Sequence, residues 1–116
     1  MFKKYELVYV NLNPKKWHIQ AWVRPCLIIQ NNLFNIKSPT LIVIPLTSNL
    51  KTPFPSEFII KSSLENWLKE DSRFLWSQII TIDKDFIVEK VWILEKKYYN
   101  DVIKAISIAL DFDDDF

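Results

Sequence analysis

The side chains that most often do chemistry are scarce in this sequence, which limits the sites it can hold. The chain has one histidine, His18, and one cysteine, Cys26, so a zinc site built from these residue types is not expected. Cys26 lies in an apolar run with no histidine beside it, which is typical of a core residue rather than a nucleophile. Because the chain contains no glycine, it lacks the glycine-rich loop that cradles nucleotide phosphates.

Arg24 and Thr47 have side chains suited to contact with an anion. A guanidinium presents several donors in one plane and can hold phosphate oxygens in a fixed geometry. A threonine hydroxyl can donate one hydrogen bond to such an oxygen. Each also has an ordinary structural interpretation: a surface ion pair or strand-edge charge for Arg24, and a loop cap on the nearby backbone for Thr47. The residue types alone therefore do not decide between chemistry and structure.

Length and composition indicate one globular domain. The chain has 116 residues, of which 49% are hydrophobic and 25% charged, and we treat 1–116 as a single domain. A lone cysteine forms no internal disulfide, which fits a reducing compartment. The N-terminus has no apolar signal core, and no stretch approaches the roughly 20 apolar residues of a membrane helix. We therefore expect a soluble, cytoplasmic protein without a membrane partner.

The net charge of +1 hides an uneven distribution. Four aspartates lie in the last six residues, and the other 110 residues hold 15 basic and 10 acidic side chains, a net charge of +5. A basic body can attract a polyanion, although an ordinary soluble surface fits the charge equally well. We read residues 110–116 as an acidic tail whose composition is typical of disorder.

The hydrophobic pattern predicts a mainly β protein that ends in a helix. Strands are predicted at 6–12, 22–29, 40–46, 56–60 and 74–82, and 88–94 is ambiguous, with a short strand as one interpretation. A polar loop is predicted at 31–39, and 63–69 fits one helical turn or a loop. Pro25 lacks an N–H, so it should lie at an edge, a bulge or the start of its strand. Apolar residues at helical spacing predict a helix over 99–110.

The absence of glycine constrains the turns. Positions that need a positive φ should fall to asparagine or aspartate, the next most tolerant residues. Several asparagines stand where the pattern places turns, among them Asn13, Asn31 and Asn49.

Three segments, in order and at the right spacing, resemble the MazF/PemK toxin family. The first is Tyr9-Val10-Asn11-Leu12-Asn13-Pro14, followed by Gln20-Ala21-Trp22-Val23-Arg24-Pro25 and an apolar strand that ends in Asn31. The second is Val43-Ile44-Pro45-Leu46-Thr47-Ser48, which continues to Glu57. The third is Gln78-Ile79-Ile80-Thr81-Ile82-Asp83-Lys84. The match extends from residue 5 to about 112.

The resemblance implies a fold, an activity and partners. The fold is a small SH3-like β-barrel of the MazF/PemK/CcdB type with a C-terminal helix, assembled as a homodimer. The activity is that of a type II toxin: a sequence-specific endoribonuclease that cuts single-stranded RNA without a metal ion or other cofactor and is inhibited by a cognate antitoxin. The catalytic pair carries over as Arg24 and Thr47, and the products are a 2′,3′-cyclic phosphate and a 5′-hydroxyl.

Further residues in the same segments are candidate RNA contacts. They are Trp17, His18, Gln20, Trp22, Ser48, Lys51 and Gln78. A tryptophan of the first loop either stacks a base, worth roughly 1–3 kcal/mol, or fills a hydrophobic gap. His18 either assists proton transfer or is an exposed loop residue.

The chain departs from the family pattern at several positions. Two loop glycines correspond to Trp17 and Trp22, the loop acid corresponds to Ile19, and the arginine of the third segment corresponds to Ile80. Because isoleucine cannot bond to a phosphate or a base, the set of RNA contacts is thinner. A catalytically inactive module that binds RNA or antitoxin therefore stays open as an alternative. A gyrase poison of the CcdB type is disfavoured, since the chain ends in acidic residues rather than a Trp-Gly-Ile terminus.

Overall fold

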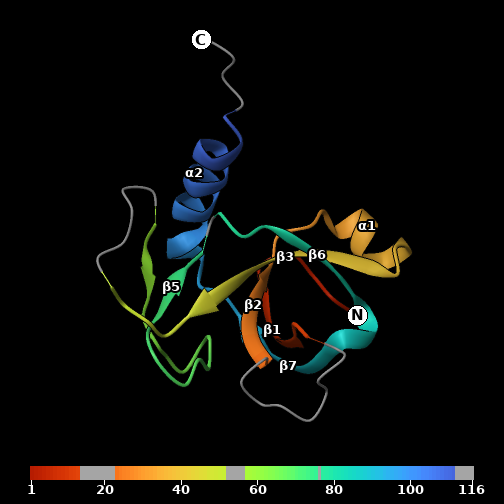
Figure 1. Cartoon of the computed structure of the whole chain (residues 1–116), viewed down its shortest axis with the longest axis horizontal. Coiled ribbons are helices and arrows are strands. Elements are labelled where there is room, and N and C mark those ends of the chain that lie inside the picture. The colour runs from red at the N-terminus through yellow and green to blue at the C-terminus, as the bar shows by residue number, and fades with distance from the viewer. Residues whose placement is uncertain (14–22, 52–56, 76, 112–116) are drawn as a thin grey trace.

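The computed structural model describes residues 1–13, 23–51, 57–75 and 77–111. Its elements are β1 (Glu6–Asn11), β2 (Val23–Ile28), α1 (Asn32–Lys37), β3 (Thr40–Thr47), β4 (Ile59–Ile60), β5 (Ser72–Phe74), β6 (Ile80–Asp83), the 3₁₀ helix η3 (Lys84–Phe86), β7 (Ile87–Ile93), the 3₁₀ helix η4 (Lys96–Tyr98) and α2 (Tyr99–Leu110) (Figure 1). The predicted class, mainly β with a C-terminal helix, is confirmed. No helix within these ranges is long and apolar enough to cross a lipid bilayer.

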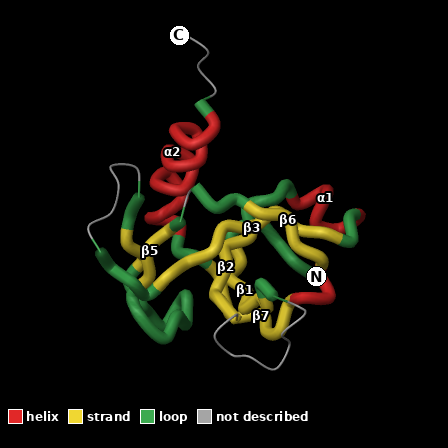
Figure 2. The backbone as a smooth tube through the Cα atoms, in the orientation of Figure 1, coloured by secondary structure: helices red, strands yellow, loops and turns green. Residues whose placement is uncertain are grey.

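The strands form one antiparallel sheet in the order β4-β5-β3-β2-β1-β7, with β6 also paired to β3. β3 is the central strand, because β2 lies along one of its edges while β5 and β6 share the other. Figure 2 shows α1 and α2 apart from each other, next to different parts of this sheet. Within the described ranges no pairing joins β4 to β7, so a closed barrel is not seen there.

The neighbouring strands β1, β2 and β3 are buried on both faces. Along β1, β2 and β3 successive side chains point to opposite faces, and two separate buried clusters result. The cluster on the α2 side contains Leu7, Leu27, Ile44, Leu46, Val102 and Ala105, among others. The cluster on the other face contains Val8, Val10, Cys26, Ile28, Leu41 and Val43, with Ile82. The near-continuous apolar sequence of β3, TLIVIPLT, reflects this burial on two sides.

The predicted polar loop at 31–39 is wrong in part, since it contains the helix α1. The Asn31 side chain caps this helix by accepting a hydrogen bond from the Leu33 N–H at 2.7 Å. Asn35 is buried, and its amide exchanges hydrogen bonds of 3.0 Å with the side chain and the carbonyl oxygen of Gln30. The asparagines that indicated a loop therefore serve as a cap and a buried hydrogen-bonding group.

The predicted strand at 74–82 is divided into β5 and β6. Both parts follow the same edge of β3, where Leu46 pairs with Phe74 and Val43 pairs with Ile80. More residues therefore separate Phe74 from Ile80 in the sequence than separate their partners in β3. Between the two strands, the Gln78 N–H donates a hydrogen bond of 2.9 Å to the Leu75 carbonyl oxygen.

The predictions for the three remaining short segments are confirmed only in part. The ambiguous segment 88–94 is a strand, β7, which pairs with β1. Residues 63–69 hold a turn and no helix, with a 3.0 Å hydrogen bond from the Trp67 N–H to the Ser63 carbonyl oxygen. The predicted strand at 56–60 is reduced to β4, and Ser56 lies outside the described residues.

Positive φ angles fall on unexpected residue types. Among the described residues they occur at Tyr5 (74°), Trp67 (54°) and Asp111 (48°). Only Asp111 matches the expectation of asparagine or aspartate. The two aromatic residues are held by ring contacts: Tyr5 stacks on Tyr99 with 3.7 Å between ring centroids, and Trp67 contacts Trp92 at 5.9 Å.

Candidate active site

A cavity opens where the pairing between β2 and β3 stops. The last pair is Cys26 with Pro45, and the next residue toward the start of β2 is Pro25. A proline has no N–H, so it cannot donate a hydrogen bond to a neighbouring strand. Pro25 pairs with Tyr9 of β1 only, so it lies where one edge of β2 is unpaired, which is one of the three positions predicted for it.

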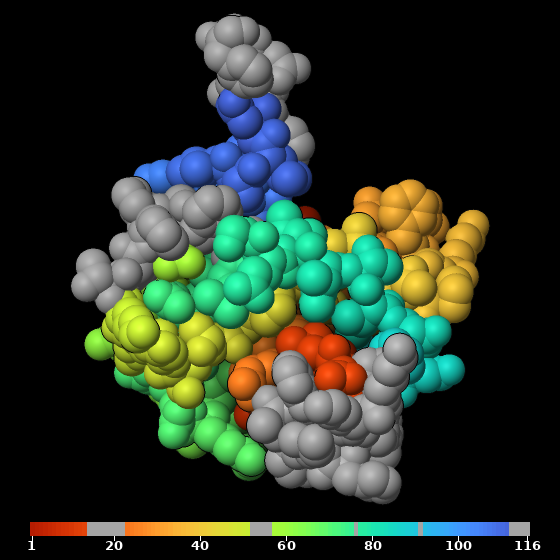
Figure 3. All heavy atoms as spheres, viewed as in Figure 1, coloured from red at the N-terminus to blue at the C-terminus, as the bar shows by residue number. Residues whose placement is uncertain are grey.

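The diverging ends of β2 and β3 leave a cavity of about 460 Å³. Its lining residues come from β1, from the start of β2, from the end of β3 and from the segment before β5. They are Tyr9, Val23, Arg24, Pro25, Leu46, Thr47, Ser48, Asn49, Leu68, Lys69, Glu70 and Ser72. In the space-filling view, β1 and β2 (red to orange) reach the surface next to the yellow end of β3 and the green segment after β4 (Figure 3).

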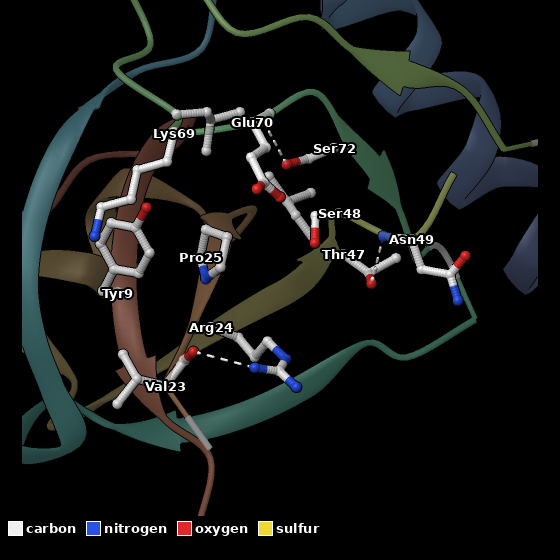
Figure 4. A pocket seen from close by; sticks show the side chains of 12 residues that line it. Tyr9, Val23, Arg24, Pro25, Thr47, Ser48, Asn49, Lys69, Glu70 and Ser72 are labelled. Atoms are coloured by element: carbon white, nitrogen blue, oxygen red, sulfur yellow. Dashed lines mark hydrogen bonds between the residues drawn. The ribbon is translucent and has the colours of Figure 1, made fainter. Parts of the chain in front are cut away.

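Arg24 presents a free guanidinium to this cavity. It lies in β2 opposite Val10 of β1, and its side chain is exposed. Its one hydrogen bond within the described ranges is a long one, 3.4 Å from Nη1 to the Val23 carbonyl oxygen (Figure 4). The surface ion pair considered from the sequence is not formed with any described residue.

Thr47 ends β3 on the same cavity. Its Oγ1 accepts a hydrogen bond of 3.2 Å from the Asn49 N–H, which is the loop-capping role considered from the sequence. A hydroxyl that accepts one bond still has its proton to donate. Behind Thr47, its cross-strand neighbour Arg73 forms an ion pair of 3.7 Å with Glu57.

The far wall of the cavity comes from β1 and from the segment before β5. The Lys69 ammonium lies 5.7 Å from the centre of the Tyr9 ring, a cation–π contact. Burial, and then the negative charge of Glu89, raise the pKa of the Tyr9 phenol. Figure 4 shows the Glu70 side chain directed into the cavity, on the side of Ser48 and Thr47.

The structure brings together some of the predicted site residues. Arg24, Thr47 and Ser48 line one cavity. Lys51 and Gln78 are exposed and do not line it. Trp17, His18, Gln20 and Trp22 lie outside the described residues.

Sequence reasoning missed the residues of the far wall. The sequence places Tyr9 in a strand and in the first family segment but gives it no role, Lys69 ends a segment that fits one helical turn or a loop, and Glu70 belongs to no predicted element. A weak signal was present: the charged run Lys69-Glu70-Asp71 directly precedes Ser72, the first residue of β5. Charged residues at the end of a loop are usually solvated, so this signal did not single them out.

Two further features concern metals and the cysteine. The described residues contain no group of three or more His, Cys, Asp or Glu side chains placed to hold a metal ion. Cys26 is fully buried behind the cavity wall. Burial raises the pKa of its thiol to about 12, although the positive charge of Arg24 acts in the opposite direction. The thiol is therefore protonated at neutral pH, in agreement with its predicted core role.

Solved structures share the fold. An endoribonuclease in complex with its cognate antitoxin, from a mycobacterial species, superposes with a TM-score of 0.78 at 16% identity, covering 97% of both chains. A MazE–MazF complex from Deinococcus radiodurans superposes with a TM-score of 0.72 at 17% identity, covering 94% of both chains.

Sequence comparison indicates the protein family as well as the fold. "Endoribonuclease MazF" of Staphylococcus saprophyticus is 35% identical over 95% of this chain and 92% of its own length. "Endoribonuclease EndoA" of Bacillus subtilis is 33% identical over 93% of both. The family model for PemK-like, MazF-like toxins of type II toxin–antitoxin systems matches residues 3–110. The chain therefore belongs to this family of toxins.

Proposed function

We propose that this toxin is an endoribonuclease that cuts single-stranded RNA at short sequence motifs without a metal ion. The observation that carries the proposal is the cavity beyond the last β2–β3 pair, which is lined by both Arg24 and Thr47. The names of the relatives, both endoribonucleases, support the same activity.

RNA supplies its own nucleophile, the 2′-hydroxyl beside the scissile phosphate. Attack on phosphorus places additional negative charge on the phosphorane oxygens, and the bond to the 5′ oxygen then breaks. The products are a 2′,3′-cyclic phosphate and a 5′-hydroxyl. Arg24 stabilises this charge electrostatically, because a guanidinium stays protonated and is a poor acid. One well-placed donor of this kind contributes about 3–4 kcal/mol, and the Thr47 hydroxyl adds a hydrogen bond to a phosphate oxygen.

The proposal assigns RNA contacts outside the catalytic pair. Ser48 lines the cavity beside Thr47, and the exposed Lys51 follows it in the same loop. Gln78 and the loop residues Trp17, His18, Gln20 and Trp22 are assigned from the sequence pattern. The net charge of +5 outside the acidic tail favours association with a polyanion.

The protein partners follow from family membership. We propose a homodimer and a cognate antitoxin, which we expect to be a short, acidic, partly disordered chain that folds over the toxin. Two of the solved structures with this fold are described as complexes of a toxin with its antitoxin. The proposal places the protein in the cytoplasm, where its free thiol remains reduced.

Cleavage of a long, mixed-sequence single-stranded RNA in EDTA tests the proposal. The parent protein is compared with the Arg24→Ala variant and with a matched control, Lys104→Ala. The control removes the same charge from an exposed position on α2. We expect cleavage by the parent and the control, and a loss of about 10²–10³-fold in Arg24→Ala. Analysis of the ends should find 2′,3′-cyclic phosphates. No cleavage by a folded, dimeric parent would overturn the proposal in favour of a binding module.

A further inference from the structure

One carboxylate lines the cavity together with the catalytic pair, and it belongs to Glu70. We propose that Glu70 accepts the proton of the attacking 2′-hydroxyl. This inference rests on the proposed RNA cleavage and adds the base that this reaction needs.

The Glu70 carboxylate is available for this role. It forms no hydrogen bond or ion pair with any other residue in the described part of the chain. Only the main chain of Glu70 is held, through a 3.0 Å hydrogen bond from the Ser72 hydroxyl to the Glu70 carbonyl oxygen. The neighbouring Asp71 differs, because its carboxylate accepts a hydrogen bond of 2.8 Å from the Ser62 N–H. The Asp71 carboxylate therefore fixes the loop, whereas the Glu70 carboxylate faces the cavity.

The loop that carries Glu70 is held by a fully buried side chain, Asn66. Its amide donates hydrogen bonds of 2.8 Å to the Lys61 carbonyl oxygen and to the Glu95 carboxylate. Its oxygen accepts hydrogen bonds from the Ser63 and Leu68 N–H groups at 3.1 and 3.0 Å. A loop anchored in this way positions Glu70 with little cost in ordering during the reaction.

The other lining residues are poor proton acceptors. Arg24 and Lys69 are cations, and the hydroxyls of Thr47 and Ser48 are neutral. Burial and Glu89 raise the pKa of the Tyr9 phenol, so this phenol also keeps its proton. By the family resemblance, the loop acid before Arg24 is replaced by Ile19, which cannot take a proton. Among the described residues that line the cavity, Glu70 is thus the side chain that can accept the proton of the 2′-hydroxyl.

The proposed step balances as follows. The Glu70 carboxylate takes the proton of the 2′-hydroxyl as its oxygen forms a bond to phosphorus. The bond from phosphorus to the 5′ oxygen breaks, and this oxygen takes a proton from water. The neutral Glu70 acid then returns its proton to the solvent, so the enzyme ends the cycle unchanged.

Substitution of the carboxylate by an amide tests the inference. Glu70→Gln keeps the size of the side chain and loses its basicity, and Glu65→Gln is the matched control, since Glu65 is exposed on the same loop and lies outside the cavity lining. Single-turnover cleavage is measured from pH 5 to 9 at a mapped site. Affinity is measured on the same RNA with a 2′-deoxy residue at that site, which cannot be cut.

For Glu70→Gln we expect cleavage at least 100-fold slower, unchanged or tighter binding of the uncut analogue, and loss of the acidic limb of the pH–rate profile. Glu65→Gln should match the parent. The inference is overturned if Glu70→Gln cuts within threefold of the parent with the same acidic limb, or if cleavage falls only in proportion to binding. A folded parent that does not cut at all refutes the proposed function itself, which is a different outcome.

Discussion

The Thr47 hydroxyl has two roles, one in the structure of the loop and one in the proposed reaction. It accepts the Asn49 N–H at 3.2 Å, which shapes the loop after β3, and its proton is free for a phosphate oxygen. The Asn49 side chain in turn accepts the Lys51 N–H at 3.2 Å. The loop that borders the cavity is therefore ordered by the same hydroxyl that we assign to the reaction.

Separating these roles requires two substitutions at Thr47. Thr47→Val removes the hydroxyl and should slow cleavage about 10–100-fold, as expected for one hydrogen bond to a charged group. The free energy of unfolding should fall by no more than about 1 kcal/mol, since the lost capping bond is exposed. Thr47→Ser keeps the hydroxyl and should retain most activity. Single-turnover cleavage and urea unfolding measure the two effects, and full activity of Thr47→Val would contradict the assignment.

The two walls of the cavity were unequally predictable from the sequence. Arg24, Thr47 and Ser48 lie in the segments that resemble the toxin family, and this resemblance, rather than the residue types, singled them out. Lys69 and Glu70 reach the cavity because Asn66 and Asp71 fold their loop back by hydrogen bonds to nearby main-chain groups. Such a network depends on the three-dimensional path of the loop, which no periodicity in the sequence encodes.

At the scale of elements, the long apolar strands were predictable and the interruptions were not. β1, β2 and β3 follow their predicted positions because burial on two faces produces unmistakable apolar runs. The division of 74–82 depends on the register against β3, which is a property of two segments together. The helix α1 is six residues long and exposes Leu33, Phe34 and Ile36, so it shows no amphipathic period.

The C-terminal end of α2 offers a simple test of the cost of lacking glycine. Asp111 ends the helix with φ 48° and ψ 69°, and its N–H donates to the Ser107 carbonyl oxygen at 2.8 Å. Glycine adopts this conformation without a Cβ penalty. An aspartate is also unfavourable beside the negative end of the helix dipole. Asp111→Gly should therefore raise the free energy of unfolding by roughly 0.5–1 kcal/mol.

Two further variants separate the conformational effect from the charge. Asp111→Asn removes the charge and keeps a residue that tolerates a positive φ, so it should be stabilising by a smaller amount. Asp111→Ala removes the charge and disfavours the conformation. Urea unfolding of the three variants should rank Gly above Asn and Asn above Ala. Equal stabilities for Gly and Ala would show that the backbone conformation at this position is not what limits the helix end.

At the scale of the whole molecule, stability rests on two apolar clusters with β1, β2 and β3 between them. Cys26 belongs to the cluster on the face away from α2 and is fully buried. Its pKa rises from 9.0 to about 12, mainly by burial, with Arg24 acting in the opposite direction. The folded protein thus keeps a proton that the unfolded chain releases above about pH 9. The free energy of unfolding should therefore fall as the pH rises from about 9 to 12, by about 1.4 kcal/mol per pH unit for this group.

The Cys26→Ala variant isolates this contribution, because other groups also titrate in the same range. The pKa values of Tyr5 and Tyr9 are raised by burial as well, so both proteins should lose stability in alkali. The parent contains the additional thiol, so its free energy of unfolding should fall more steeply with pH than that of the variant. Urea unfolding at steps between pH 7 and 11 should give a constant difference between parent and variant below pH 9 and a change that favours the variant above it. A difference that stays constant to pH 11 would mean that the thiol ionises in the folded protein as readily as in the unfolded chain, and that the core around Cys26 admits water.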